Sequence, residues 1–255
     1  MQASRDPMRD PNHQLVVSFL TTGRVIGYLG LFLPASLLAW SLTFGDSIRG
    51  SVSEYYYTPV RDLFVGTLTA MAIFLWSYRG YSLQGQDLRL DWFVGKFAAV
   101  MALLTAFSPL IPRNDDRCTL VQCVLGTRVA DQIHAVAATA FIVCLLVFCV
   151  YLMPRNDVPG PRLRARAILY RSCGAIIALT VIGMVTWKSL PAELIFALGG
   201  YRPIFWLEAF AIWAFSLAWL VRGHALRHHI MLGNGARRDD AIAAPPELSR
   251  AAGIA

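Results

Sequence analysis

The chain has 255 residues, of which 56% are hydrophobic and only 15% are charged, and its formal net charge is +7. Soluble globular proteins carry about 25% charged residues. This composition excludes secreted disulfide scaffolds, disordered chains and soluble nucleotide-binding folds, and it predicts an all-α integral membrane protein. The excess of positive charge predicts contact with membrane lipids and requires no nucleic-acid partner.

Six apolar segments are long enough to cross a membrane, since a transmembrane helix needs about 20 mainly apolar residues. We therefore predict a polytopic bundle of six spans, at residues 25–44, 62–78, 92–110, 129–153, 168–187 and 205–221.

These spans divide the chain into a polar N-terminal tail (1–24), a transmembrane domain (25–223) and a basic C-terminal tail (224–255) whose last part, 241–255, is predicted to be disordered. The apolar piece at 190–198 is too short to span and is predicted to be a re-entrant or surface segment.

The distribution of basic residues predicts the orientation. Fifteen of the 23 Lys and Arg residues lie in the two tails and in the second and fourth loops, and seven lie in the other loops or at their edges. Because cytoplasmic loops carry the excess of Lys and Arg, both termini are predicted to be cytoplasmic. Cys118 and Cys123 then lie outside, where a disulfide between them is permitted.

Polar side chains gather where the second, fourth and sixth spans begin, all at the predicted external end. Each span carries an acid there, and Glu208 stands deeper than the other two, flanked by apolar residues. His134 shares a helix face with Asp131, because residues three apart are neighbours on a helix. The predicted rim of the external mouth consists of these acids and His134 with their polar, basic and aromatic neighbours: Ser51, Ser53, Glu54, Tyr55, Tyr56, Tyr57, Arg61, Asp62, Arg128, Asp131, His134, Lys188, Arg202 and Glu208.

Three interpretations of this rim remain open. The acids and tyrosines are helix caps and an interfacial aromatic belt, or the rim is a pocket in which Arg61 or Arg202 holds an anionic headgroup. In the third, Asp131, His134 and Glu208 form an acid–base or metal site.

No tight ligand motif supports a metal, so none is predicted. His224 and His228 have the spacing of a zinc pair, but they lie at the opposite end of the bundle, about 30 Å from His134.

The runs SVSEYYY (51–57), RDLFVG (61–66), FLWSYRGY (74–81) and FWLEAFAIWAFSLAWLVRG (205–223) carry a resemblance. The chain resembles a family of bacterial six-helix membrane proteins of unknown function. The resemblance implies that His134 and Glu208 belong to the family pattern and that the protein lies in the bacterial inner membrane. A weaker similarity to ceramidase-like membrane hydrolases implies Ser, Asp and His chemistry between helices, although the number of helices and the placement of the histidine pair differ.

The sequence therefore predicts an inner-membrane protein whose external-side pocket binds or handles a lipid or small amphiphile. The predicted ligand-binding residues are eight members of the rim: Tyr55, Tyr56, Arg61, Asp62, Asp131, His134, Arg202 and Glu208. The alternatives are a membrane-embedded hydrolase, with or without a metal, a small-solute transporter, and a structural or assembly protein. No particular cofactor is indicated.

Overall fold

The computed structural model describes residues 11–44, 47–80, 89–111 and 118–243, with side chains for 24–44, 47–80, 89–111, 118–187 and 189–226. These residues form helices and no strand. In chain order the elements are α1 (Pro11–Thr43), the 3-10 helix η2 (Ser53–Tyr57), α2 (Arg61–Ser77), α3 (Arg89–Phe107), α4 (Leu120–Leu125), α5 (Thr127–Val147), the π-helical turn η3 (Phe148–Leu152), α6 (Met153–Arg155), α7 (Leu163–Lys188), α8 (Ala192–Gly199) and α9 (Pro203–Ala243).

Five described helices are long and apolar enough to cross a membrane: α1 from Arg24, α3, the continuous helix from α5 through α6, α7, and α9 as far as Leu226. The prediction of an all-α membrane protein is confirmed. The remaining predicted span, the second (62–78), corresponds to α2, whose 17 residues fall just short of the length that defines the other five.

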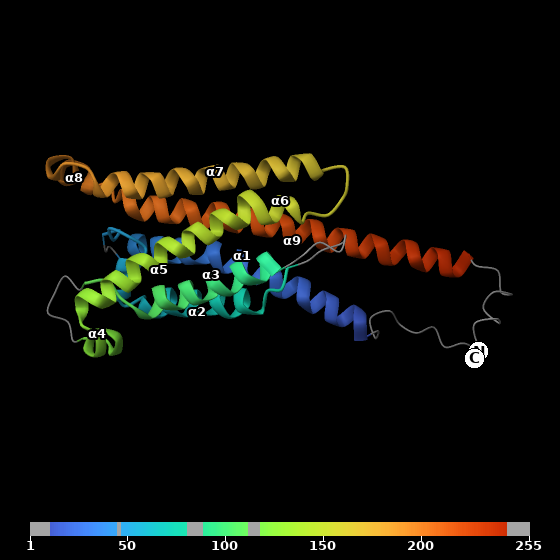
Figure 1. The fold of residues 1–255 in the computed structure, drawn as a ribbon, viewed down its shortest axis with the longest axis horizontal. Helices are drawn as coiled ribbons and strands as arrows, with labels where there is room; N and C mark the ends of the chain where they lie inside the picture. The colour runs from blue at the N-terminus through green and yellow to red at the C-terminus, as the bar shows by residue number, and fades with distance from the viewer. Residues whose placement is uncertain (1–10, 45–46, 81–88, 112–117, 244–255) are drawn as a thin grey trace.

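The long helices lie side by side along the longest axis of the molecule (Figure 1). Helix α9 packs against α1 on one side and α7 on the other, and the chain of contacts continues from α1 to α2, α3 and α5. Weaker contacts of α5 with α7 and α9 complete the ring. Helix α9 therefore lies between α1 and α7 and contacts both.

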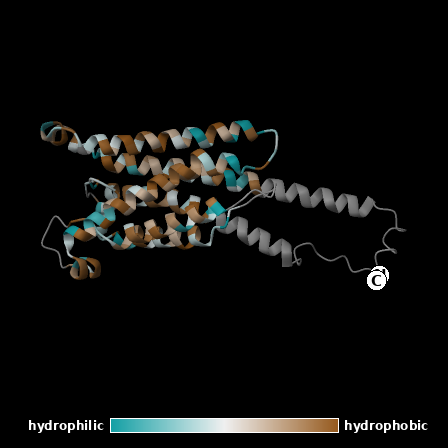
Figure 2. Ribbon diagram, in the orientation of Figure 1, coloured by the Kyte–Doolittle hydropathy of each residue, from teal (hydrophilic) through white to brown (hydrophobic). Residues whose placement is uncertain are grey.

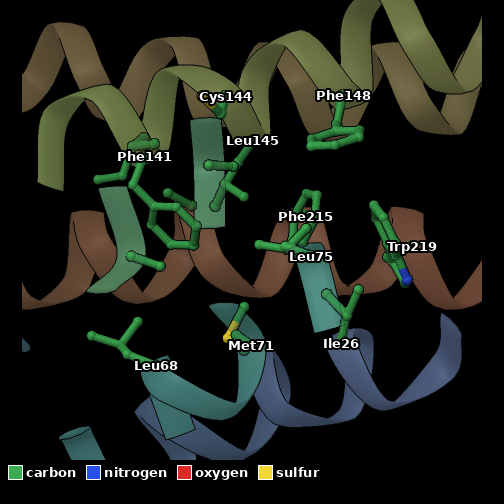
Figure 3. Packing of buried hydrophobic residues seen from close by; sticks show 14 of the residues in the cluster. Ile26, Leu68, Met71, Leu75, Phe141, Cys144, Leu145, Phe148, Phe215 and Trp219 are labelled. Atoms are coloured by element: carbon green, nitrogen blue, oxygen red, sulfur yellow. The ribbon is translucent and has the colours of Figure 1, made fainter. Parts of the chain in front are cut away.

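Aromatic and aliphatic side chains fill the space between α2, α5 and α9 (Figure 3). Phe148 lies at the centre, with its ring centroid 6.1 Å from that of Phe215 and 5.4 Å from that of Trp219. Phe148 belongs to the π-helical turn η3. Leu152, which ends this turn, and Met153, which begins α6, are also buried, so the helix keeps an apolar face toward the core near its end.

The outer surface of the bundle is also apolar, as Figure 2 shows by the brown colour along the helices. On α7 the outward-facing side chains Ile168, Leu179, Ile182 and Val185 are each more than half exposed. Exposure of this many apolar side chains along one helix is unfavourable in water, and hydrocarbon removes that cost. The polar residues concentrate at the helix ends, as a membrane-spanning bundle requires.

The helices differ from the predicted segments at both ends of the chain. Helix α1 begins at Pro11, inside the predicted N-terminal tail, and α9 continues through the predicted C-terminal tail to Ala243. Hydropathy marks only the apolar part of a helix, and a polar sequence can continue it because the backbone hydrogen bonds are internal. The segment predicted to be disordered, 241–255, lies outside the described residues from residue 244 onward.

The predicted external end contains three short helices. The apolar piece at 190–198 forms α8, which has no buried residue and is a surface helix, one of the two predicted alternatives. The helices η2 and α4 were not predicted at all, because each is about one turn or two in length and lacks a measurable period.

Helices α1 and α9 approach most closely at two glycines of α1. A Cβ atom on Gly30 would overlap the hydroxyl of Ser216, and one on Gly27 would lie 2.6 Å from Cγ of Leu220. Ser216 cannot move away easily, because it is fully buried and donates a hydrogen bond to the Ile212 carbonyl at 2.7 Å. Small residues at helix crossings allow such close packing in membranes.

We expect Gly30→Ala to lower the free energy of unfolding by about 1–3 kcal/mol, because overpacking forces the two helices apart. Gly66→Ala is the matched control, since a Cβ there meets nothing within 4 Å and alanine favours a helix by up to about 1 kcal/mol. Thermal denaturation in detergent, followed by circular dichroism, measures both variants. Equal midpoints for the two would contradict the close packing of α1 and α9.

Candidate binding site at the predicted external end

The loop before η2 lies on the beginning of α9 and is fixed there by backbone hydrogen bonds. The Val52 N–H donates to Oε2 of Glu208 at 2.7 Å, and the Phe205 N–H donates to the Gly50 carbonyl at 3.0 Å. Glu208 therefore has a definite structural role, which explains why a carboxyl group is found a full turn inside an apolar helix. The same contacts position Ser51 and Ser53 beside α9.

A cavity of about 230 Å³, which we call the α5–α7 cavity, lies next to this loop. Polar groups and apolar side chains line it together, and most of the apolar ones come from α5 and α7. The polar members are Ser51, Ser53, His134, Thr139 and Glu208, and the apolar members include Ile142, Val181, Met184, Val185 and Trp187.

His134 is buried, and its Nδ1 lies 2.7 Å from the Ser108 carbonyl oxygen. A carbonyl can only accept, so Nδ1 carries the hydrogen and donates it. In the neutral ring Nε2 is then an acceptor. The contact with α3 thus fixes the tautomer of an imidazole that lines the α5–α7 cavity.

The tyrosines of the predicted rim are packing residues in this structure. Tyr55 is completely buried, its hydroxyl is 2.6 Å from Oγ of Ser41, and its ring contacts Phe205 at a centroid distance of 5.9 Å. Tyr56 is also buried, and the Arg61 guanidinium stacks over its ring at 4.1 Å and donates to its hydroxyl. These contacts attach η2 to α1, α2 and α9.

Four more of the predicted ligand-binding residues, all charged, do not line the α5–α7 cavity. Arg61 and Asp62 are exposed in the first turn of α2, where an acid is favoured by the helix dipole. Asp131 accepts a hydrogen bond from the Ile111 N–H at 3.2 Å. Arg202 lies in the turn between α8 and α9 with a φ of 54°. Of the eight predicted ligand-binding residues, only His134 and Glu208 are brought together around the cavity.

The segment around α4 contains a local disulfide and is joined to the bundle by a buried amide. Cys118 and Cys123, the predicted disulfide candidates, are bonded to each other in the structure. Between them, Gln122 is buried and its side-chain amide donates to the Tyr57 hydroxyl at 2.9 Å and to the Leu110 carbonyl at 3.1 Å. This end of the bundle is therefore a connected structure.

A second polar group of residues, which the sequence analysis missed, is buried at the opposite end. Asp91 is fully buried and accepts a hydrogen bond from Nδ2 of Asn156 at 2.7 Å. Arg222 of α9 is buried beside them and interacts electrostatically with Asp91. Together with the buried hydroxyls of Tyr78 and Tyr170, these residues form what we call the Asp91 cluster.

The Asp91 cluster joins the end of α2 to α3, α7, α9 and the residue that follows α6. In the sequence, Asp91 directly precedes the predicted third span and Arg222 directly follows the sixth, so both counted as ordinary loop residues. The available indication was their opposite charge at the same predicted level of the membrane, since ionisable groups there commonly pair.

We expect Asp91→Ala to lower the free energy of unfolding by about 3 kcal/mol, because it leaves the buried Arg222 charge without its counter-charge. Asp62→Ala is the control, since Asp62 is exposed and such substitutions usually change stability by less than about 0.5 kcal/mol. Thermal denaturation of both variants in the same detergent checks this. A loss of stability no larger for the Asp91 variant would contradict a structural role for the cluster.

The fold and the apolar outer surface define this chain as a helical membrane protein. Comparison with models of protein families, with curated proteins and with solved structures finds no match. The resemblance to a bacterial six-helix family stays a prediction. Among the residues that the structure describes, no group of three or more His, Cys, Asp and Glu side chains could hold a metal ion, so Asp131, His134 and Glu208 do not form such a group.

Proposed function

We propose that this protein binds a small amphiphile, or the polar end of a lipid, in the α5–α7 cavity. The observation that supports the proposal is that the cavity lining combines polar and apolar residues. Glu208, His134 and two serines supply most of the polar groups, and apolar side chains, mainly of α5 and α7, supply most of the remaining lining. Binding sites for small molecules typically combine apolar walls with a few polar groups that fix orientation.

The size and position of the cavity favour a molecule that enters from the membrane. A volume of about 230 Å³ accommodates a headgroup and a short part of a chain. Val185 and Thr139 line the cavity and are also exposed on the surface of the bundle, on α7 and α5 respectively. A ligand with an apolar tail can therefore keep that tail in hydrocarbon while its polar end occupies the cavity.

The chemistry of the lining selects the kind of polar end. Among the residues whose side chains are described, no Lys or Arg lines the cavity, and neither Arg61 nor Arg202 belongs to it. Glu208 offers carboxyl oxygens and neutral His134 offers Nε2 as an acceptor. These groups favour a head that donates hydrogen bonds, such as an amine or a hydroxyl, over an anionic head.

We further propose that α2 is a sixth span, that both termini are cytoplasmic, and that the membrane is the bacterial inner membrane. The 17 residues of α2 lie at the lower limit of the usual range for a span, and α2 packs between α1 and α3. The bias of Lys and Arg toward one set of loops supports the orientation.

The test uses the purified full-length protein with octylamine and octyl sulfate as probes, which share a chain and differ in the head. Native mass spectrometry should show one octylamine retained by the wild type and at least fivefold less octyl sulfate. We expect Ala138→Phe, which fills the cavity, and Glu208→Gln, which removes the charge, each to reduce octylamine retention at least fivefold.

Val136→Phe is the matched control, because Val136 is exposed on the same helix and does not line the cavity. It should retain octylamine as the wild type does. If Ala138→Phe and Val136→Phe retain equal amounts, or if octyl sulfate binds as well as octylamine, the proposal is wrong. Thermal midpoints of all three variants show whether each is folded.

A further inference from the structure

A larger cavity, of about 860 Å³, lies at the opposite end of the bundle, and we call it the basic cavity. It lies between the first turns of the α1 span, the α9 helix near residue 224 and the segment that leads into α7. The residues that carry the argument are Arg24, Tyr28, Arg162, Arg166, Leu220 and His224.

The described lining of the basic cavity contains three arginines and a histidine, and none of its described members is acidic. One of the arginines is neutralised, because Nε of Arg166 donates to Oδ2 of Asp157 at 2.7 Å. Arg166 also donates to the Val158 carbonyl at 2.5 Å. Arg166 therefore fixes the loop that forms one wall of the cavity.

No described residue balances the remaining positive charge. No ion pair or hydrogen bond joins the guanidinium group of Arg24 or Arg162 to a described residue, and Arg162 is exposed directly before α7. Two guanidinium groups that line one cavity, with no partner carboxylate among the described residues, create a positive potential there, which favours an anion. Arginine is suited to phosphate in particular, because its planar fork of N–H groups matches two phosphate oxygens.

The walls of the basic cavity add a second requirement. Leu220, Val221, Val158 and two prolines contribute apolar surface. Tyr28 lines the cavity and is 59% exposed, so the cavity reaches the outer, membrane-facing surface of α1. A ligand with an anionic phosphate and an attached apolar part satisfies both the charge and the walls.

The position of the cavity identifies the source of such a ligand. It lies at the bundle end where the sequence concentrates Lys and Arg, which we propose to be cytoplasmic. Anionic lipids of the cytoplasmic leaflet attract basic groups there by about 1 kcal/mol per residue, and basic pockets between transmembrane helices bind their headgroups.

We infer that the basic cavity binds the phosphate group of an anionic phospholipid through Arg24 and Arg162. This site is separate from the α5–α7 cavity, and its ligand has the opposite charge. It does not depend on the proposed function of that cavity.

The experiment measures binding of dihexanoyl-phosphatidylglycerol to the full-length protein by isothermal titration calorimetry, below the critical micelle concentration of the lipid. Dihexanoyl-phosphatidylcholine, which carries the same phosphate with a neutral net charge, and inorganic phosphate are the comparison probes. We expect phosphatidylglycerol to bind at least tenfold more tightly than either.

The decisive variants are two double substitutions with the same change in net charge. Arg24→Gln/Arg162→Gln should weaken phosphatidylglycerol binding at least tenfold. Arg164→Gln/Arg171→Gln should change it less than twofold, because both residues are exposed on α7 and neither lines the cavity. The single variant Arg162→Gln, at an exposed position, should lose about threefold and guards against misfolding of the double variant.

Equal losses in the two double variants would show only general attraction to basic loops and would overturn the inference. Equal affinity for phosphatidylcholine would overturn the requirement for an anionic lipid. Inorganic phosphate that competes with the lipid at equal concentration would assign the cavity to a soluble anion and overturn the assignment to a lipid.

Discussion

The cost of leaving a polar group without a partner in hydrocarbon determines how this chain is arranged. Each backbone N–H and C=O in a span must be satisfied internally, which only a helix achieves within one segment. Hydroxyl groups inside the bundle follow the same rule, since Thr105, Thr180 and Ser216 each donate to a carbonyl of their own helix. Polar side chains that make contacts between elements are consequently concentrated at the two ends.

The same cost explains why α9 carries polar residues near both ends of the bundle. Near its beginning Glu208 holds the loop before η2, and near the end of its membrane-spanning part Arg222 lies in the Asp91 cluster. Between them the helix is mainly apolar. Ser216 donates to its own helix, and the Trp213 indole donates to the Leu31 carbonyl of α1. The helix packs against α1 and α7. A single helix therefore links the chemistry of one membrane face to that of the other.

The two ends differ in charge because their polar groups serve different surroundings. At one end a carboxyl group and an imidazole line a small cavity, and none of its described lining residues is basic. At the other, arginines line a larger cavity, and none of its described lining residues is acidic. The proposed ligands follow from this contrast, a hydrogen-bond-donating head at the first end and a phosphate at the second. The Asp91 cluster closes the bundle beside the basic cavity.

The sequence was sufficient to predict the helical membrane fold, because long apolar runs allow no other structure in lipid. It also included His134 and Glu208 in the predicted rim, because a polar group within an apolar helix is costly unless it has a partner. It could not separate these two from Tyr55, Tyr56 and Arg61, because whether a rim residue faces a cavity or packs on a neighbour depends on helix rotation and on short helices such as η2. Asp91 and Arg222 were missed since only tertiary contact brings positions 131 residues apart together.

The two cavities lie near the two ends of α7, and both proposed ligands require these ends to lie on opposite sides of a membrane. Single cysteines at Tyr201 and Arg164, both exposed, report on these ends in a background that carries Ser at positions 118 and 123. The remaining cysteines are buried and serve as an internal control. A membrane-impermeant maleimide should label Tyr201→Cys in intact cells and Arg164→Cys only after permeabilisation. Labelling of both from the same side would contradict the account.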